Sequence, residues 1–172
     1  MSDMFLLGIF AALLLATLLV LDLRRRLRAR RAALPQAVLD GSNVMHWGEG
    51  GPKLATVAAV LRLAEARGYE AGVIFDANAG YLIAGHYMNE VQFAKALAVR
   101  AANVLVVPKG TQADPYLLDY ARKTGAILIS NDRFRDRIAE YPELAVPGRR
   151  VPGGIGAAGV WVNLPDLRAQ AA

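Results

Sequence analysis

The stretch around which the chain is organised is Val38-Leu39-Asp40-Gly41-Ser42-Asn43. Two apolar residues end abruptly in a carboxylate, a glycine, a hydroxyl and an amide. If Val38 and Leu39 close a buried strand, Asp40 lies at its C-terminal end, the edge where open α/β sheets bind ligands. Gly41 would let the backbone turn sharply there. An ordinary strand-to-helix turn with a capping residue explains the same residues. The stretch therefore indicates a functional site only if other functional residues reach the same edge of the sheet.

Short apolar runs alternate with helical patterns along the rest of the chain. Strands are predicted over residues 37–40, 71–75, 103–107 and 126–129, helices over 52–67, 89–100, 114–124 and 133–140, and an edge strand near 159–162. Gly68 and Gly125 end two of the helices. The alternation predicts an α/β fold of three layers, with a mostly parallel central sheet and helices on both faces. Right-handed crossovers then place all the strand C-termini at one edge.

Acidic residues gather at that edge. The residues just past the four strands are Asp40, Asp76, Lys109 and Asp132, so three strands deliver a carboxylate to the same edge. Carboxylates crowded together repel one another, which raises their pKa values. A hard divalent cation relieves the repulsion, and Mg²⁺ binds through one or two carboxylates, waters and a substrate phosphate. Such an ion can activate water and stabilise the leaving oxygen of a phosphodiester.

Further acids open or line the predicted helices. Asp114 begins one helix, and Asp132 and Asp136 have the i, i+4 spacing that places two side chains on one helix face. Each acid alone has a structural explanation. Asp114 before Pro115 is typical of an N-cap, and Asn131 or Asp132 could also cap. Their joint arrival at one edge is what favours chemistry.

Three segments resemble the NYN branch of PIN-like nucleases, most nearly the regnase-type (MCPIP-type) endoribonuclease domains. The segments are V-L-D-G-S-N-V at 38–44, D-P-Y-L-L-D-Y-A-R at 114–122 and G-A-I-L-I-S-N-D-R-F-R-D at 125–136. The resemblance covers about residues 38–145. It implies a PIN-like fold and a metal-dependent endoribonuclease that uses Mg²⁺ or Mn²⁺ and acts on single-stranded or loop RNA.

The resemblance also assigns roles to individual residues. It implies that the catalytic and metal-holding residues are Asp40, Asp114, Asp132 and Asp136, and that the supporting residues are Asn43, Ser42 and Asn131. One departure concerns the metal: where regnase-type domains carry two adjacent aspartates, this chain has Ala113-Asp114. Whether the site holds one metal ion or two therefore stays open. An alternative function also stays open, that of a degenerate domain that binds RNA or a protein partner without catalysis. Asp76 could supply an extra carboxylate or simply end its strand.

Candidate substrate contacts are fewer. Lys109 and Arg133 lie near the same edge and could hold backbone phosphates. Trp47 could stack on a base and His46 could act as a general acid, although a packed tryptophan and a structural histidine are the more common outcomes. A small-molecule phosphatase is a third hypothesis, weakened because the chain shows no covalent aspartyl motif and no glycine-rich phosphate loop. The absence of cysteine excludes disulfides and fits a reducing compartment.

The first part of the chain has the composition of a membrane anchor. Residues 4–21 carry no charge, and the only charged side chain before them is Asp3. Arg24 to Arg31 follow as RRRLRARR. The apolar length suits a transmembrane helix, and the charge order is the reverse of a secretory signal peptide. The positive-inside rule places the N-terminus outside and the rest in the cytoplasm. We predict a single-pass anchor over 1–23, a basic juxtamembrane linker over 24–36 and the NYN domain over 37–172, in an inner or plasma membrane.

The net charge of +5 does not point to nucleic acid. Six of the 20 basic residues lie within 24–31, and Asp3 and Asp22 also precede residue 32, which leaves 14 basic and 13 acidic residues beyond it. The arginines suit anionic lipid headgroups. RNA is therefore predicted as a partner from the resemblance alone. A homodimer, and an apolar helix docked on a partner protein in place of an anchor, stay open.

Overall fold

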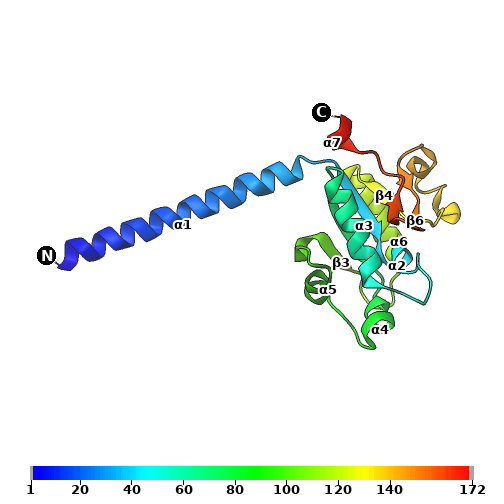
Figure 1. The fold of residues 1–172 in the computed structure, drawn as a ribbon, viewed down its shortest axis with the longest axis horizontal. Coiled ribbons are helices and arrows are strands. Elements are labelled where there is room, and N and C mark those ends of the chain that lie inside the picture. The colour runs from blue at the N-terminus through cyan, green and yellow to red at the C-terminus, as the bar shows by residue number, and fades with distance from the viewer. Residues whose placement is uncertain (1, 171–172) are drawn as a thin grey trace. The chain divides into compact units, whose positions relative to one another are not determined.

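A computed structural model describes residues 2–170, without the side chains of residues 2–6, 11, 12 and 32. Residue 1 of the predicted anchor and residues 171–172 of the predicted NYN domain lie outside the described residues. The chain forms two compact units, Met1–Leu34 and Pro35–Ala172, whose elements are labelled in Figure 1. The division lies near the predicted start of the NYN domain, at residue 37.

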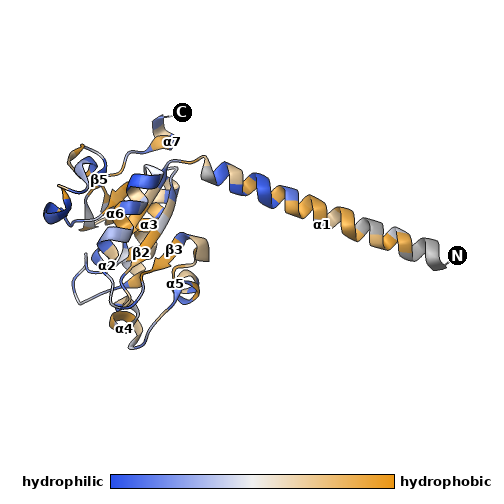
Figure 2. Ribbon diagram, turned by 180° about the vertical axis from the view of Figure 1, so that it is seen from behind, coloured by the Kyte–Doolittle hydropathy of each residue, from blue (hydrophilic) through white to orange (hydrophobic). Residues whose placement is uncertain are grey.

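The first unit is a single helix, α1 (Ser2–Ala32). Its segment Leu7–Arg31 is long and apolar enough to cross a membrane, and it contains an 18-residue stretch with a mean hydropathy of 2.1. The arginines continue this helix, so the segment predicted as a linker is helical over most of its length. Figure 2 shows the apolar turns followed by hydrophilic ones. Length and composition alone support a membrane span here.

The second unit is built on a five-stranded sheet in which every pairing is parallel. The strand order is β3-β2-β1-β4-β5. The strands are β1 (Gln36–Asp40), β2 (Glu70–Phe75), β3 (Val104–Val106), β4 (Ile127–Ile129) and β5 (Arg150–Val151). The four predicted strands are therefore confirmed, and the all-parallel pairing confirms that their C-termini share one edge.

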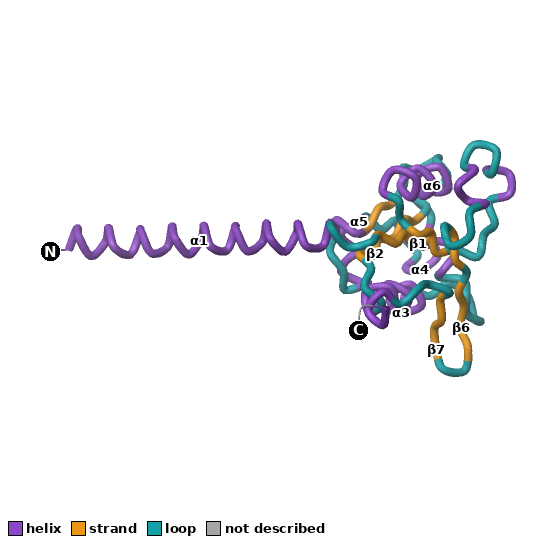
Figure 3. Tube along the Cα trace, turned by 90° about the horizontal axis from the view of Figure 1, so that it is seen from above, coloured by secondary structure: helices purple, strands orange, loops and turns teal. Residues whose placement is uncertain are grey.

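Helices cover both faces of this sheet, as Figure 3 shows for α3 (Leu54–Ala66) on one side and α6 (Ala113–Thr124) on the other. Alternate residues of β1 enter different cores: Leu39 packs with the α3 side and Val38 with the α6 side. Helix α5 (Glu90–Leu97) packs into the same core as α3. The predicted three-layer α/β fold is confirmed, because period-two apolar strands need a helix layer on each face.

Local capping explains where these helices begin and end. Asn89 and Gln92 form a reciprocal capping box at the start of α5, with hydrogen bonds of 3.0 and 2.9 Å. Gly125 ends α6 in the left-handed conformation at φ 72°. Three short α-helices were not predicted: α2 (Gly41–Val44), directly after β1, α4 (Ala79–Ala84), after β2, and α7 (Leu167–Gln170), after β7.

The predicted helix over 133–140 is wrong. Only a 3-10 turn, η2 (Arg135–Arg137), forms there. Phe134 before it is buried in the α6-side core and adopts a left-handed backbone at φ 47°. An α-helix cannot run through that conformation. Asp132 and Asp136 therefore do not stack on one helix face as predicted.

The predicted edge strand at 159–162 exists as β7 (Gly159–Val162), but it does not join the main sheet. It pairs antiparallel with β6 (Gly153–Gly156) in a separate hairpin. The edge of the main sheet is β5. At two residues, β5 is too short to show a period-two pattern.

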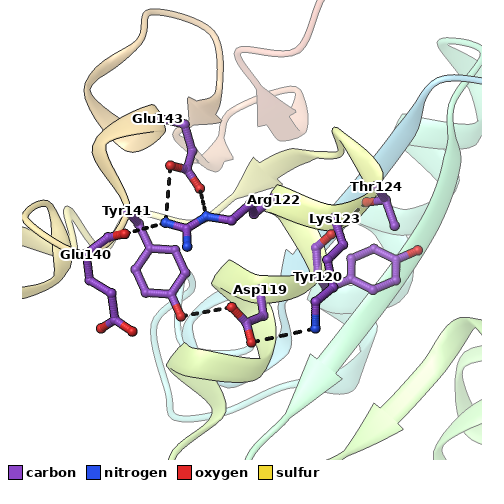
Figure 4. A network of polar contacts seen from close by, with 8 residues as sticks. All are labelled: Asp119, Tyr120, Arg122, Lys123, Thr124, Glu140, Tyr141 and Glu143. Atoms are coloured by element: carbon purple, nitrogen blue, oxygen red, sulfur yellow. Dashed lines mark hydrogen bonds and ion pairs between the residues drawn. The ribbon is translucent and has the colours of Figure 1, made fainter.

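A polar network holds the segment after η2 against α6 (Figure 4). Arg122 of α6 donates to Glu143 at 2.6 Å and to the carbonyl oxygen of Glu140, and its guanidinium lies 4.1 Å from the ring centre of Tyr141. The Tyr141 hydroxyl donates to Asp119 at 3.1 Å. These contacts hold the segment that directly follows η2, the turn that contains Asp136.

Gly41 is required for space and not, as predicted, for a sharp turn. A Cβ atom there would lie 2.6 Å from the ring of Phe75 and 2.7 Å from Val73, and the backbone is not in the left-handed region. Helix α2 thus begins in direct contact with β2.

We expect Gly41→Ala to destabilise the second unit by about 1–3 kcal/mol, the usual cost of overpacking a core. Trp47 and Trp161, the two tryptophans, both lie in this unit, so their fluorescence during thermal unfolding measures the effect. Gly156→Ala is the matched control, because a Cβ there meets only ordinary contacts at 3.7 Å or more. Equal unfolding midpoints for the two variants would contradict the expectation.

Candidate active site

The candidate site lies where the strand order changes direction. The chain runs from β1 to β2 and β3 on one side, and then returns to place β4 and β5 on the other side of β1. Open α/β sheets bind ligands at this switch point, beyond the strand C-termini. Asp40 is the last residue of β1, and Ser130-Asn131-Asp132 directly follow β4. The two motifs of the sequence therefore meet at the switch point.

Hydrogen bonds fix the carboxylate of Asp40. Its Oδ1 accepts from the backbone N–H of Asn43 at 3.0 Å, and its Oδ2 accepts from the hydroxyl of Ser130 at 2.9 Å. The same hydroxyl accepts from the backbone N–H of Asp132 at 3.0 Å. A carboxylate has about four acceptor sites, so Asp40 keeps the capacity to bind a cation.

Asn43 and Asn131 join the two motifs a second time. The side-chain oxygen of Asn43 accepts from the backbone N–H of Asn131 at 3.1 Å and from the indole of Trp47 at 2.8 Å. Asn131 exchanges two hydrogen bonds with the backbone of Gly153, at 2.9 and 3.1 Å. Ser42 accepts from the backbone N–H of Asp76 at 3.0 Å. All three residues predicted as supporting thus hold the loops in place.

Asp40 is buried, with 8% of its surface exposed. Burial raises the pKa of Asp40 from 3.8 to about 6, although the hydrogen bonds from Asn43 and Ser130 oppose the shift. The negative charges of Asp114 and Asp76 raise the pKa of Asp40 further. A hard cation would remove this penalty by neutralising the charge.

Asp114 faces the same space. It is half-buried on the first turn of α6, and no described group hydrogen-bonds its carboxylate. The capping alternative is therefore wrong for Asp114, because the helix begins one residue earlier, at Ala113. Burial raises the pKa of Asp114. The nearby carboxylates of Asp132, Asp76 and Asp136 raise it further, and Arg137 opposes them.

Asp132 and Asp136 reach the site from a loop and not from a helix. The Oδ1 of Asp132 accepts from the backbone N–H of Phe134 at 2.8 Å and so closes a tight turn. Asp136 is exposed and lies 3.7 Å from the Nε of Arg137. Both acids act on the pKa of Asp114. Each of the other three predicted acids therefore interacts electrostatically with Asp114.

Asp76 completes this group, although from the sequence it could equally have served only to end its strand. Its Oδ1 accepts from the backbone N–H of Ala113 at 3.0 Å, so its carboxylate lies at the start of α6. It raises the pKa of both Asp40 and Asp114. The available signal was its place directly after β2, at the same edge of the sheet as Asp40. We call Asp40, Asp76, Asp114, Asp132 and Asp136 the acid cluster.

Cationic side chains also lie at this edge of the sheet. Lys109 and Arg133 are both exposed, and Lys109 lines a cavity with Asp76. Arg137, which was not predicted, donates to Gln112 at 3.0 Å and opposes the rise in the pKa of Asp114. Arginine and lysine here could neutralise a backbone phosphate.

His46 and Trp47 have structural contacts. The Nδ1 of His46 donates to the backbone carbonyl oxygen of Ser42 at 2.8 Å. Trp47 packs so closely on Gly153 that a Cβ there would lie 2.5 Å from the indole. With its N–H on Asn43, this ring supports the D-G-S-N loop and is not free to stack on a base.

Comparison with known families identifies the domain. The model of the Zc3h12a-like ribonuclease NYN domain matches residues 33–152, well over half of the chain. The chain belongs to this family. The predicted resemblance to NYN nucleases is confirmed. None of the curated proteins compared with the chain matches it by sequence.

Two solved structures have a similar fold. Two structures of the nuclear proteinaceous RNase P 2 (PRORP2) of Arabidopsis thaliana are 16% identical to the chain, with TM-scores of 0.57 and 0.54. The similarity covers 77% of this chain but only 30% of the PRORP2 chains. At this identity the likeness establishes the fold alone.

The donors of this NYN domain fit a hard divalent cation, since the acid cluster contains only carboxylate oxygens and two of its members have raised pKa values. As they stand, no three His, Cys, Asp or Glu side chains among the described residues enclose an ion. Mg²⁺ needs only one or two carboxylates because it keeps several waters. The arrangement therefore suits a water-rich ion better than a closed all-protein cage.

Proposed function

We propose that the protein is a membrane-anchored, divalent-metal-dependent endoribonuclease that hydrolyses RNA phosphodiesters at the acid cluster. The observation that carries this proposal is that Asp114 interacts electrostatically with the four other carboxylates of the acid cluster, at the switch point of an NYN fold. Burial raises the pKa values of Asp40 and Asp114, and repulsion from the neighbouring carboxylates raises them further. Among the described residues, only the more distant charge of Arg137 opposes the shift at Asp114. Such a cost is typical of sites that bind a cation.

The acid cluster would hold Mg²⁺ or Mn²⁺. The ion, when bound, would lower the pKa of water and stabilise charge on the phosphate. The protein's own contribution is preorganisation. Ser130 and Asn43 orient Asp40 through both oxygens. Lys109 and Arg133, exposed at the same edge, would contact the phosphates of the RNA on either side of the scissile bond.

The test uses the full chain in detergent micelles, end-labelled single-stranded RNA and Mn²⁺. We expect internal cleavage that EDTA stops and that Asp132→Asn reduces by at least about 10-fold to 100-fold, the effect of losing groups that hold or orient a metal. Glu65→Gln is the control, because Glu65 is an exposed carboxylate on α3, outside the acid cluster. Cleavage that survives both EDTA and Asp132→Asn would overturn the proposal.

Ala113 supports a second candidate, a degenerate domain that binds RNA or a protein partner without catalysis. This residue is buried in the α6-side core, at the position where the regnase-type resemblance implies a first aspartate. The same experiment separates the candidates, because a degenerate domain would retain labelled RNA without turnover and regardless of EDTA.

We further propose that α1 anchors the protein in an inner or plasma membrane with its N-terminus outside. Its long apolar segment supports a span, and the arginines that follow support the orientation. Recovery in the soluble fraction without detergent would contradict the anchor. A homodimer stays a prediction, which sedimentation of the purified protein would test.

A further inference from the structure

A cavity of about 540 Å³ lies beside the acid cluster, between two loops at the C-terminal edge of the sheet. One wall comes from the segment after β2, including Asp76 and Tyr81 of α4, and from Tyr87. The other wall is the segment Lys109–Gln112, which connects β3 to α6. Because Asp76 belongs to both, the cavity opens directly beside the acid cluster.

Two exposed tyrosines line this cavity. Tyr81 is 57% exposed and Tyr87 is 47% exposed. They are held close together because α4 packs on the loop that carries Tyr87: a Cβ on Gly80 would lie 2.5 Å from the backbone nitrogen of Met88 and 2.8 Å from the carbonyl oxygen of His86. The aromatic wall is therefore built into the fold. Tyrosine rings of this kind are the usual stacking partners of unpaired RNA bases.

Polar groups complete the cavity. Lys109 is exposed, and no described acidic group forms an ion pair with it. Asn78 and Gln112 add side-chain amides, which can donate to and accept from a base edge. The volume lies within the range of small-ligand sites. A single nucleotide matches this set: a planar base for the tyrosines, hydrogen-bonding edges for the amides and a phosphate for the lysine.

We propose that this cavity is a base-binding subsite, which takes one unpaired RNA base next to the scissile phosphate and places its own phosphate on Lys109. The inference rests on the proposed ribonuclease function and adds how the enzyme selects its substrate. A base in a duplex is stacked and paired, so it cannot enter. The subsite thus restricts cleavage to single-stranded or loop RNA.

The test compares three variants of the full chain in detergent: Tyr81→Leu/Tyr87→Leu, Tyr81→Phe/Tyr87→Phe and Tyr120→Leu. Binding of fluorescent single-stranded RNA is measured by anisotropy in EDTA, so that no turnover intervenes. We expect the double leucine variant to bind about 10-fold to 100-fold more weakly, because stacking of one base is lost. The phenylalanine variant keeps both rings and should bind within about twofold of the wild type. Tyr120 is an exposed tyrosine of α6 outside the cavity, and its variant should also bind normally.

Photo-crosslinking gives a second readout that does not depend on affinity. RNA carrying 5-iodouridine should crosslink to the peptides that contain Tyr81 or Tyr87. Crosslinks confined to other peptides, or equal RNA affinity of the leucine and phenylalanine variants, would overturn the subsite, whatever the cavity then binds. Failure of the subsite would leave metal-dependent cleavage intact, whereas failure of the proposed function would appear as RNA left uncut by the wild type with Mn²⁺.

Discussion

Asp40→Asn is expected to make the metal-free protein more stable at pH 7.5 while it removes RNA cleavage. The wild-type carboxylate is buried and ionised at this pH, against a pKa of about 6. The difference from its ordinary value of 3.8 corresponds to at most about 3 kcal/mol. Asparagine keeps the acceptor for the N–H of Asn43 without the charge. We expect a gain of about 1–3 kcal/mol, or about 2–4 °C in Tm for each kcal/mol.

The pH dependence identifies the cause. A carboxyl whose pKa is raised in the folded state binds its proton more readily there than in the unfolded chain. Its favourable contribution is complete below pH 3.8 and is lost as the pH rises through about 6. The wild type should therefore lose stability relative to Asp40→Asn between about pH 4 and pH 7. Tryptophan fluorescence in EDTA across this range measures the difference, and Glu65→Gln should behave like the wild type.

Added Mg²⁺ should reverse the order of stabilities. A ligand that binds only the folded state stabilises it in proportion to the logarithm of its concentration over its Kd. The wild type should gain and Asp40→Asn should not. If both proteins gain equally, Asp40 does not hold the metal. If Asp40→Asn is the less stable protein in EDTA at pH 7.5, the raised pKa is not the dominant effect of this residue.

Asp76→Asn is expected to weaken Mn²⁺ binding by about 10-fold to 100-fold, and Ala113→Asp in the same chain should restore part of it. The reason is position: the Asp76 carboxylate accepts the backbone N–H of Ala113 at 3.0 Å and so occupies the start of α6. An asparagine can accept the same N–H, so helix capping is retained and only the charge is lost. Isothermal titration with Mn²⁺ gives the affinity without dependence on activity.

Ala113→Asn in the Asp76→Asn background is the matched control, since asparagine has about the size of aspartate without its charge. Because Ala113 is 5% exposed, thermal unfolding must show that each variant is folded at the temperature of the titration. Asp76→Glu, which moves the carboxylate by one methylene and leaves the side chain at position 113 unchanged, should retain most of the binding. Unchanged Mn²⁺ affinity in Asp76→Asn would show that Asp76 only caps α6.

Much of the fold could be predicted because its signals are local. The strands ending at Asp40 and before Ser130 are apolar runs bounded by polar residues, and Gly68 and Gly125 stop their helices within one turn. The prediction of a helix over 133–140 was wrong for the opposite reason. The residues of this segment are compatible with a helix, but burial of Phe134 in the α6-side core imposes a left-handed backbone on that residue. No local pattern carries that contact.

The sequence by itself determined the family, the α/β alternation, the apolar helix before the domain and the carboxylates that follow its strands. Only the tertiary structure decided that Gly41 is needed for contact with Phe75, that Asp76 lies at the start of α6, and that Asp40 is desolvated enough to raise its pKa. Chain periodicity and capping act over a few residues. Close packing and the energy of a buried charge depend on groups far apart in the chain, which only the folded sheet brings together.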